Sequence, residues 1–277
     1  MIIPATEEQI ISSEAISAKL QMFREFKHRQ LRAGQKQALL RYHFFNQSDK
    51  KFFFLNAPPG SGKSLLGMLL LPPFRGVYLC SSKYLQDQIL HDFPEAKILK
   101  GRSNYQCKKY TFLTCDACTQ EKEEYKCSDC PYQIAKAAAM NAPFTILNYS
   151  YFFAEANHVG KFSKRDVIVA DEADLAEHQL LAAVEINIRK SWAEKYNLPM
   201  PKFSTASTDQ GVQRWIEWAR QLIETLKPEA AALQAKVDDL AEDGNFRDEV
   251  MAKMFAFLKK ELQQLKGVLL RLEQFTS

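Results

Sequence analysis

The sequence has no long apolar run and no obvious targeting segment. Its 277 residues contain no stretch that approaches about eighteen consecutive apolar residues, so we expect no membrane-spanning helix. Residues 1–8 carry acid rather than base, which argues against a secretory signal. Internal repeats and low-complexity tracts are also absent. With 46% hydrophobic and 25% charged residues, the composition predicts a soluble globular protein of the cytoplasm or nucleoid.

A strong charge of one sign is also lacking. The net charge of +4 is too small to indicate nucleic-acid binding, although residues 24–51 hold eight Lys or Arg and only two acids. Cysteines are few and unevenly placed, because five of the six fall within the 24 residues from Cys107 to Cys130. In a compartment that keeps thiols reduced, such clustering favours a metal site over disulfides.

The pattern along the chain predicts an α/β fold with a parallel sheet, because strand-like and helix-like stretches alternate. The expected strands are residues 52–55, 76–80, 144–147 and 167–170, and the expected helices are 63–71 and 83–91. Beyond residue 185 the chain turns helical. One helical series ends at Pro228, and a second runs from Met251 to Leu272 with steps of three and four.

Four zones follow from these patterns. We expect a first sheet-forming part over 1–100, a cysteine-bearing insertion over 101–142, a second sheet-forming part over 143–180 and a helical region over 181–277. The last helix reaches almost to Ser277 without a capping signal. We therefore expect the helical region to be incomplete.

A phosphate-binding loop follows the first expected strand. Gly60 and Gly62 would let the backbone curl and aim N–H groups at phosphate oxygens. Lys63 would place a positive charge on the β- and γ-phosphates, and Ser64 would supply a hydroxyl ligand for Mg²⁺. The predicted ligand is therefore ATP or GTP. The candidate loop consists of Ala57, Pro58, Pro59, Gly60, Ser61, Gly62, Lys63 and Ser64.

Two adjacent acids directly follow the expected strand over 167–170. Asp171 would reach the Mg²⁺ shell, and Glu172 would orient and deprotonate the water that attacks the γ-phosphate. A strand followed by Asp-Glu is common by itself. With a P-loop upstream it predicts hydrolysis rather than nucleotide storage, with Lys63, Asp171 and Glu172 as the catalytic groups.

The cysteines have the spacing of paired metal knuckles. Cys115-x2-Cys118 and Cys127-x2-Cys130 would suit tetrahedral Zn²⁺. An iron–sulfur cluster is the alternative. Spacing alone favours zinc, and Cys107 is left over.

Several of these stretches resemble motifs of superfamily 2 helicases. The loop from Ala57 to Ser64 is similar to motif I, and Asp171–Asp174 is similar to motif II. Arg32–Gln35 resembles the Arg-x-x-Gln element near the adenine, and residues 77–88 resemble motif Ia, which touches the DNA backbone. Position 174 departs from the family, which commonly has histidine there.

The iron–sulfur helicases of the XPD/DinG group give the most specific resemblance. Its residues are Lys100–Cys107, then Cys130–Tyr132, then Asn148–Tyr151, in the family's order. The match covers residues 23–180. It implies a RecA-like domain interrupted by an iron–sulfur domain and followed by a helical arch.

The resemblance also implies a set of site residues. Gln35 would lie near the adenine. A [4Fe–4S] cluster would be held by Cys107, Cys118, Cys127 and Cys130, with Cys115 in place of Cys118 as the alternative ligand. The implied nucleic-acid contacts are Ser81, Ser82, Lys83, Gln86, Lys100 and Arg102.

The function implied is an ATP-dependent DNA helicase that moves 5′ to 3′ on single-stranded or forked DNA. A second RecA-like domain, in cis or in trans, would supply an arginine finger, so this chain alone is expected to bind ATP but to hydrolyse it poorly. Two alternatives remain at this point. One is a DNA-dependent ATPase that does not unwind, and the other is a zinc-stapled nucleic-acid-binding module with a regulatory nucleotide site.

Overall fold

Two compact units make up the part of the chain that the structure describes. The computed structural model describes the main chain of residues 31–70, 75–117, 129–158, 160, 162, 164–203, 208–242 and 249–277. The first unit falls within Met1–Lys100 and Gln133–Ala183, and the second within Gly101–Tyr132 and Val184–Ser277.

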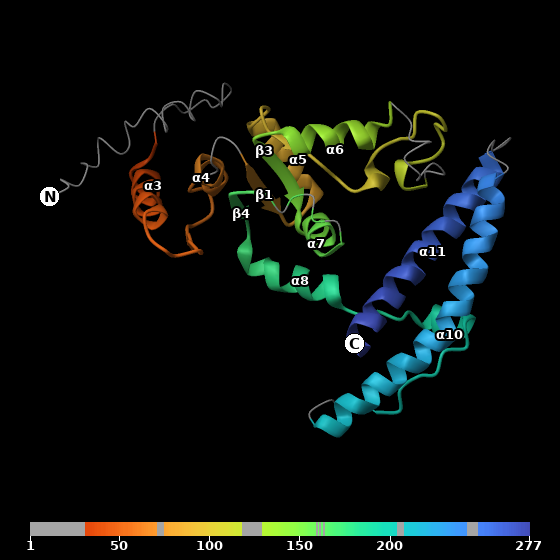
Figure 1. The fold of residues 1–277 in the computed structure, drawn as a ribbon. Coiled ribbons are helices and arrows are strands. Elements are labelled where there is room, and N and C mark those ends of the chain that lie inside the picture. The colour runs from red at the N-terminus through yellow and green to blue at the C-terminus, as the bar shows by residue number, and fades with distance from the viewer. Residues whose placement is uncertain are drawn as a thin grey trace. The chain divides into compact units, whose positions relative to one another are not determined.

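A parallel sheet forms the centre of the first unit (Figure 1). Its four strands lie in the order β2-β3-β1-β4, and every pairing is parallel. The predicted α/β class is confirmed, as are the strands predicted over 76–80, 144–147 and 167–170. The strands are β1 (Gly76–Cys80), β2 (Lys97–Ile98), β3 (Phe144–Asn148) and β4 (Val167–Ala170).

The strand β1 lies in the interior of the sheet and is buried along its whole length. It pairs with β3 on one side and with β4 on the other, so that Tyr78 lies opposite Ile146 and Val169. A parallel strand that is covered on both faces needs a continuous run of apolar residues. The run from Val77 to Cys80 meets that requirement, and Tyr78 is its one hydroxyl-bearing member.

Helices surround this sheet. The predicted helices beginning at Lys63 and Lys83 are confirmed, and Ser82 caps the second one by accepting a hydrogen bond from the Leu85 N–H at 3.3 Å. The predicted end at Leu71 lies outside the described residues. The helices are α3 (Ala33–Asn46), α4 (Lys63–Leu70), α5 (Lys83–Asp92), α6 (Pro131–Asn141), α7 (Tyr149–His158) and α8 (Ala176–Val184).

The strand predicted over 52–55 is wrong. Residues 50–58 have no regular secondary structure and pair with no strand within the described ranges. Phe52 and Phe54 are 78% and 85% exposed, whereas Leu55 packs on the core. An apolar stretch becomes a strand only if a neighbouring edge satisfies its backbone groups. Here β4 is an edge strand, and Ile168 on it is likewise exposed.

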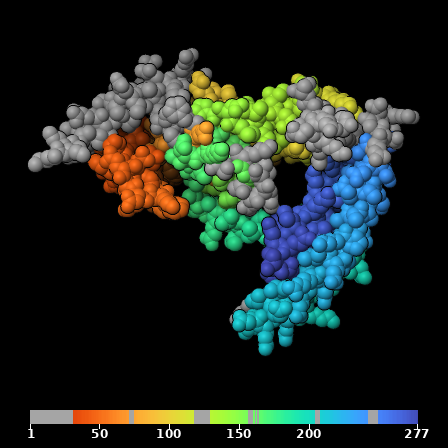
Figure 2. Space-filling view, in the orientation of Figure 1, coloured from red at the N-terminus to blue at the C-terminus, as the bar shows by residue number. Residues whose placement is uncertain are grey.

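The second unit is built around two long helices. These are α10 (Asp209–Glu242) and α11 (Glu249–Thr276), which pack along their length (Figures 1 and 2). Residues near Leu226 meet residues near Leu269, while Val237 meets Phe255, so the two helices are antiparallel. The shorter elements are α9 (Lys190–Lys195) and the 3-10 turns η1 (Arg102–Asn104) and η2 (Cys115–Ala117).

Pro228 does not end its helix, contrary to the prediction, because α10 continues through it to Glu242. Proline removes one main-chain hydrogen bond and costs about 3 kcal/mol inside a helix. Leu226 and Ala230, on either side of Pro228, are buried against α11. This packing offsets the lost hydrogen bond. The second predicted series is confirmed, since Leu262, Leu265, Leu269 and Leu272 lie on the buried face of α11.

A buried carboxylate joins α9 to α11. Glu261 accepts hydrogen bonds from Lys195 and from the Tyr196 hydroxyl. Burial alone would raise the pKa of Glu261, but the hydrogen bonds from Lys195 and Tyr196 outweigh it and lower that pKa. The group is therefore ionised in the folded second unit.

Within the described ranges, no helix combines the length and apolar character that crossing a membrane requires.

Candidate functional site

The predicted phosphate loop adopts a conformation that only glycine reaches without strain at two positions. Gly60 has φ of 75° and Gly62 has φ of 83°, and both values lie in the left-handed region. The loop passes directly into α4, because the Leu66 N–H bonds to the Gly62 carbonyl at 3.1 Å. Main-chain N–H groups at the start of α4 thus lie at the loop, as an anion site requires.

Two side chains at the start of α3 hold this loop. Arg32 Nη1 donates to the Gly60 carbonyl at 2.8 Å, and Gln35 Nε2 donates to the Ser61 carbonyl at 2.9 Å. Gln35 also accepts a hydrogen bond from the Arg32 N–H at 2.9 Å, which fixes both residues at the end of the helix. The Arg-x-x-Gln element thus braces the loop, and Gln35 is buried.

The loop keeps two polar groups for an anion. Lys63 Nζ donates to the Ala57 carbonyl at 3.2 Å, so its ammonium group lies across the loop. Ser61 Oγ is buried and finds no hydrogen-bond partner among the described residues. A buried hydroxyl without a partner is unfavourable unless a ligand supplies one. Phosphate oxygens would satisfy Ser61 and would replace the carbonyl on Lys63.

The Asp171 side chain is fixed by hydrogen bonds where β4 ends. Tyr78 Oη donates to Asp171 Oδ2 at 2.8 Å, and the Glu172 N–H donates to Oδ1 at 3.0 Å. The main chain is held as well, because the Asp171 N–H bonds to the Leu79 carbonyl at 3.0 Å. Tyr149 Oη donates to the Asp171 carbonyl at 2.7 Å.

Glu172 stands in an unusual backbone conformation beside it. Its φ of 52° and ψ of 50° place it in the left-handed region, where a residue other than glycine costs roughly 1–2 kcal/mol. Its carboxylate accepts a hydrogen bond from the Ser81 hydroxyl, just beyond the end of β1. Such strain is typical of functional positions. Here it turns the Glu172 carboxylate toward the end of the neighbouring strand.

The loop and the acidic pair meet at one edge of the sheet. Parallel strands β1 and β4 end together, which brings Ser81 beside Glu172. Tyr78 connects β1 with the acidic pair, because its hydroxyl donates to Asp171 Oδ2. The structure therefore brings Tyr78, Ser81, Asp171 and Glu172 into one polar network. Ser64 lies at the start of α4, which contacts β4.

Charge and burial suppress other ionisations around this network. Burial, and then the charge of Asp171, raise the pKa of Tyr78. The same two causes raise the pKa of Tyr149 to about 12 and, together with Glu172, that of Cys80 to about 12. These three groups are therefore neutral near pH 7.

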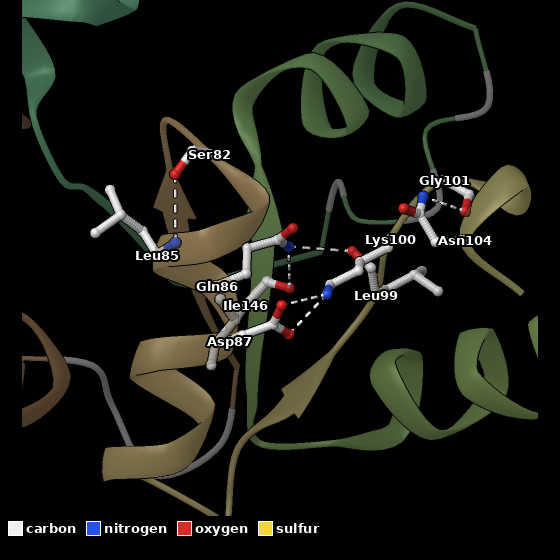
Figure 3. A network of polar contacts seen from close by, with 9 residues as sticks. All are labelled: Ser82, Leu85, Gln86, Asp87, Leu99, Lys100, Gly101, Asn104 and Ile146. Atoms are coloured by element: carbon white, nitrogen blue, oxygen red, sulfur yellow. Dashed lines mark hydrogen bonds and ion pairs between the residues drawn. The ribbon is translucent and has the colours of Figure 1, made fainter.

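One residue predicted to contact DNA is buried in the sheet. Gln86 on α5 is fully buried, and its Nε2 donates to the carbonyls of Leu99 and Ile146 at 3.3 Å each (Figure 3). The predicted contact to nucleic acid is wrong for Gln86. Gln86 lies in a helix with many polar residues, so the sequence does not show that the helix face carrying it packs against the sheet.

The other residues predicted to contact nucleic acid differ in how exposed they are and in whether they already have partners. Ser82 caps α5, and Lys83 is exposed beside it. Lys100 is bound to both oxygens of Asp87 at 2.6 and 2.7 Å (Figure 3). Arg102, in the second unit, lies over the Tyr132 ring at 5.1 Å from its centroid. Lys83 is therefore the predicted contact most open to a phosphate.

Two cysteine sulfurs lie together in the second unit. Cys115 is buried, and its Sγ lies 3.9 Å from Cys130 Sγ. Cys107 packs nearby and its sulfur accepts the Tyr110 N–H at 3.5 Å. Cys118 and Cys127 lie outside the described residues. Among the described side chains no group of three or more metal ligands is assembled, and the pair that does meet includes Cys115, which the sequence ranks only as the alternative ligand.

Several contributors to the site went unrecognised in the sequence. Arg32 was expected only as part of a motif, yet it braces the loop. Tyr78 and Tyr149 hold Asp171 from a strand and a helix that are far apart in sequence. A tyrosine in an otherwise apolar strand is a usable signal, because a buried phenol almost always has a hydrogen-bond partner.

Comparison of the sequence with models of known protein families and with curated proteins finds no match. Inference about function therefore depends on the chemistry of the residues themselves. The first unit contains a loop suited to holding phosphate, an ammonium group and two adjacent carboxylates. Such a set suits binding and hydrolysis of a magnesium-bound triphosphate.

The loop conformation makes Gly62 hard to replace. We expect Gly62→Ala to lower the free energy of unfolding by about 1–3 kcal/mol, because φ of 83° strains alanine and the new Cβ would collide with Gln35 Nε2. The measurement is urea unfolding followed by circular dichroism.

Gly34→Ala is the matched control, since Gly34 lies in the first turn of α3, has no positive φ and has free space around it among the described residues. It should be neutral or stabilise by up to about 1 kcal/mol. Equal stability of the Gly62 variant and the parent would contradict the strained loop.

Proposed function

We propose that this chain is the ATPase and cysteine-cluster part of a DNA helicase of the XPD/DinG type, which moves 5′ to 3′ on single strands. The observation that carries the proposal is that the first unit holds both a phosphate loop with positive φ at Gly60 and Gly62 and a hydrogen-bonded Asp171–Glu172 pair. In this proposal the first unit is the greater part of a RecA-like domain, and α10 and α11 belong to the helical arch.

Nucleotide binding uses the loop first. The N–H groups around Gly60 and Gly62 and the positive end of α4 receive the phosphates. Lys63 then exchanges the Ala57 carbonyl for a β- or γ-phosphate oxygen. Arg32 and Gln35 keep the loop open for this exchange because they hold its carbonyls from the side of α3.

Magnesium fits the oxygen groups on the other side. Ser64 and Asp171 offer a hydroxyl and a carboxylate, the hard ligands that Mg²⁺ prefers, and Tyr78 already holds the Asp171 carboxylate. When bound, Mg²⁺ would neutralise the charge that develops on the β- and γ-phosphates. Glu172 then orients the attacking water and accepts its proton.

Ser81 links this chemistry to the expected DNA contact. Its hydroxyl donates to Glu172, while the next residues, Ser82 and Lys83, begin α5. Tyr84 follows and is largely exposed, as an aromatic that stacks on bases would be. Movement of this segment on a DNA strand would thus reach the catalytic base through one hydrogen bond. Full activity would further need the arginine of a second RecA-like domain, supplied in cis or in trans.

The cysteine cluster favours a revised ligand set. We propose Cys107, Cys115 and Cys130 as ligands, with either Cys118 or Cys127 as the fourth. Cys115 is buried, and its sulfur lies against that of Cys130. This position suits a cluster ligand better than it suits the one cysteine of the five that binds no metal. A [4Fe–4S] cluster in these four cysteines would staple a segment that has little core of its own.

One observation favours a second candidate, the zinc-stapled module. The sulfurs of Cys115 and Cys130 lie 3.9 Å apart. Two sulfur ligands of a tetrahedral zinc site with Zn–S bonds of about 2.3 Å lie about 3.8 Å apart, which is close to this distance. A cubane places each thiolate on a different iron and so spreads the sulfurs further. Metal identity therefore separates the two candidates.

Nucleotide binding is the first test. The wild-type chain should bind a fluorescent ATP analogue with an affinity that rises on adding Mg²⁺. Lys63→Ala should weaken binding about 10- to 100-fold, because a buried charge-assisted hydrogen bond to phosphate is lost. Glu172→Gln should bind the nucleotide like wild type, since it alters the base and not the phosphate site. An affinity indifferent to both Mg²⁺ and Lys63 would refute the nucleotide site.

DNA binding tests the helicase part of the proposal. Lys83→Gln should reduce affinity for a single-stranded oligonucleotide and lower the slope of log affinity against log salt by about 0.7, the value for one phosphate contact. Lys97→Gln is the matched control, because Lys97 is an exposed lysine of the same unit on the edge strand β2. Its salt slope should stay that of wild type. Identical effects of both substitutions would rule out a phosphate track along α5.

Metal analysis tests the cluster. Protein purified without oxygen should be brown and contain about four irons, and Cys115→Ser should lose the iron together with the visible absorption. Cys80→Ala is the control, since Cys80 lies in β1 of the first unit and should keep the metal. A colourless protein with one zinc would replace the helicase proposal by the zinc-stapled module. Full iron content in the Cys115 variant would restore Cys118 and Cys127 as the middle pair.

A further inference from the structure

Tyr78 carries the only hydroxyl group among the side chains of β1, and it points into the proposed nucleotide site. The ring is 1% exposed and lies in the middle of the sheet. Its Oη donates to Asp171 Oδ2 at 2.8 Å. One buried phenol therefore connects the interior strand β1 with the first acid after β4.

Asp171 has a partner for every polar atom. Its N–H bonds to Leu79, its carbonyl accepts from Tyr149, and its Oδ1 accepts from the Glu172 N–H. Tyr78 occupies the remaining oxygen, Oδ2. Without that hydrogen bond the carboxylate would still be attached through Oδ1 alone and could turn about its side-chain bonds. The Tyr78 hydroxyl is thus the contact that sets the carboxylate plane.

The helix after the phosphate loop is shaped around the Tyr78 ring. A Cβ at Gly67 of α4 would lie 2.7 Å from Tyr78 Cε2 and 3.0 Å from Val169 Cγ1. Contacts this short would force the buried ring to move, because real Cβ atoms do not approach other atoms so closely. Glycine at position 67 therefore lets α4 pack directly on the Tyr78 ring.

We propose that Tyr78 is a positioning residue for the divalent cation, holding the Asp171 carboxylate in the orientation in which it binds the cation. This inference rests on the proposed nucleotide site and goes beyond it by assigning a role to a residue outside both motifs. Mg²⁺ tolerates little deviation from octahedral geometry. A preset carboxylate ligand therefore raises its affinity by removing the cost of ordering that ligand.

Tyr78→Phe tests this role because it deletes the hydroxyl and keeps the ring in its place beside Gly67. Binding of the fluorescent ATP analogue is titrated with Mg²⁺, and separately measured in EDTA. The Mg²⁺ concentration for half-maximal binding should rise about 3- to 10-fold, the scale of one hydrogen bond to a carboxylate. Binding in EDTA should stay as in wild type. A purely structural role would lower both together.

Tyr149→Phe is the matched control. It also deletes a buried tyrosine hydroxyl bonded to Asp171, but this one bonds to the main-chain carbonyl and not to the carboxylate. Its melting temperature should fall about as much as that of Tyr78→Phe, while its Mg²⁺ midpoint stays near that of wild type. Equal midpoint shifts in the two variants would overturn a specific role for Tyr78.

The failure of this inference differs from the failure of the proposed function. If wild-type protein shows no Mg²⁺-dependent nucleotide binding, the proposed function falls and this inference falls with it. If wild type responds to Mg²⁺ and Tyr78→Phe responds identically, only this inference falls. Should the phenylalanine variant not fold, 3-fluorotyrosine placed at position 78 keeps the hydroxyl. Its fluorine resonance should shift when Mg²⁺ is added to the nucleotide-bound protein, and an unchanged resonance would overturn the role.

Discussion

The hydrogen bonds around Asp171 decide how the whole site is arranged. They come from β1, from α7 and from the residue that follows Asp171, so that three parts of the first unit converge on one residue, two of them on its carboxylate and Tyr149 of α7 on its main-chain carbonyl. A carboxylate is the strongest acceptor in this network, and hydrogen bonds to it are shorter and stronger than those between neutral groups. The loop that faces it is held independently by Arg32 and Gln35. The two halves of the site are thereby preorganised before any ligand arrives.

Much of this arrangement was visible in the sequence, because it depends on local rules. The run from Val77 to Cys80 has to be an interior strand of a parallel sheet, since it is apolar throughout. Gly60 and Gly62 are needed wherever the backbone takes positive φ. Parallel strands end at a common edge, so a loop after one segment and two acids after another can be expected to meet. These rules need no knowledge of distant contacts.

The sequence failed where distant contacts decide. Phe52–Leu55 has the composition of a strand, yet the described residues offer it no partner edge and it stays irregular. Pro228 is a helix breaker by its own chemistry, but packing of Leu226 and Ala230 on α11 carries α10 through it. Gln86 looks like a surface residue and is instead bonded to the main chain of two other segments. Tyr78 signals only that its phenol needs a hydrogen-bond partner, and not that this partner is Asp171, 93 positions away.

The acidic pair follows an edge strand of the sheet. Among the described strands β4 forms a ladder with β1 alone, whereas β1 forms two, so β4 can separate from the sheet by breaking a single row of main-chain hydrogen bonds. Edge strands open at lower free energy than interior ones. The hydroxyls of Tyr78 and Tyr149 fasten the end of β4 where that row stops. The Tyr78 hydroxyl, which aims the Asp171 carboxylate, therefore also keeps the strand from fraying, and losing it would disorder the carboxylate and loosen the sheet in the same step.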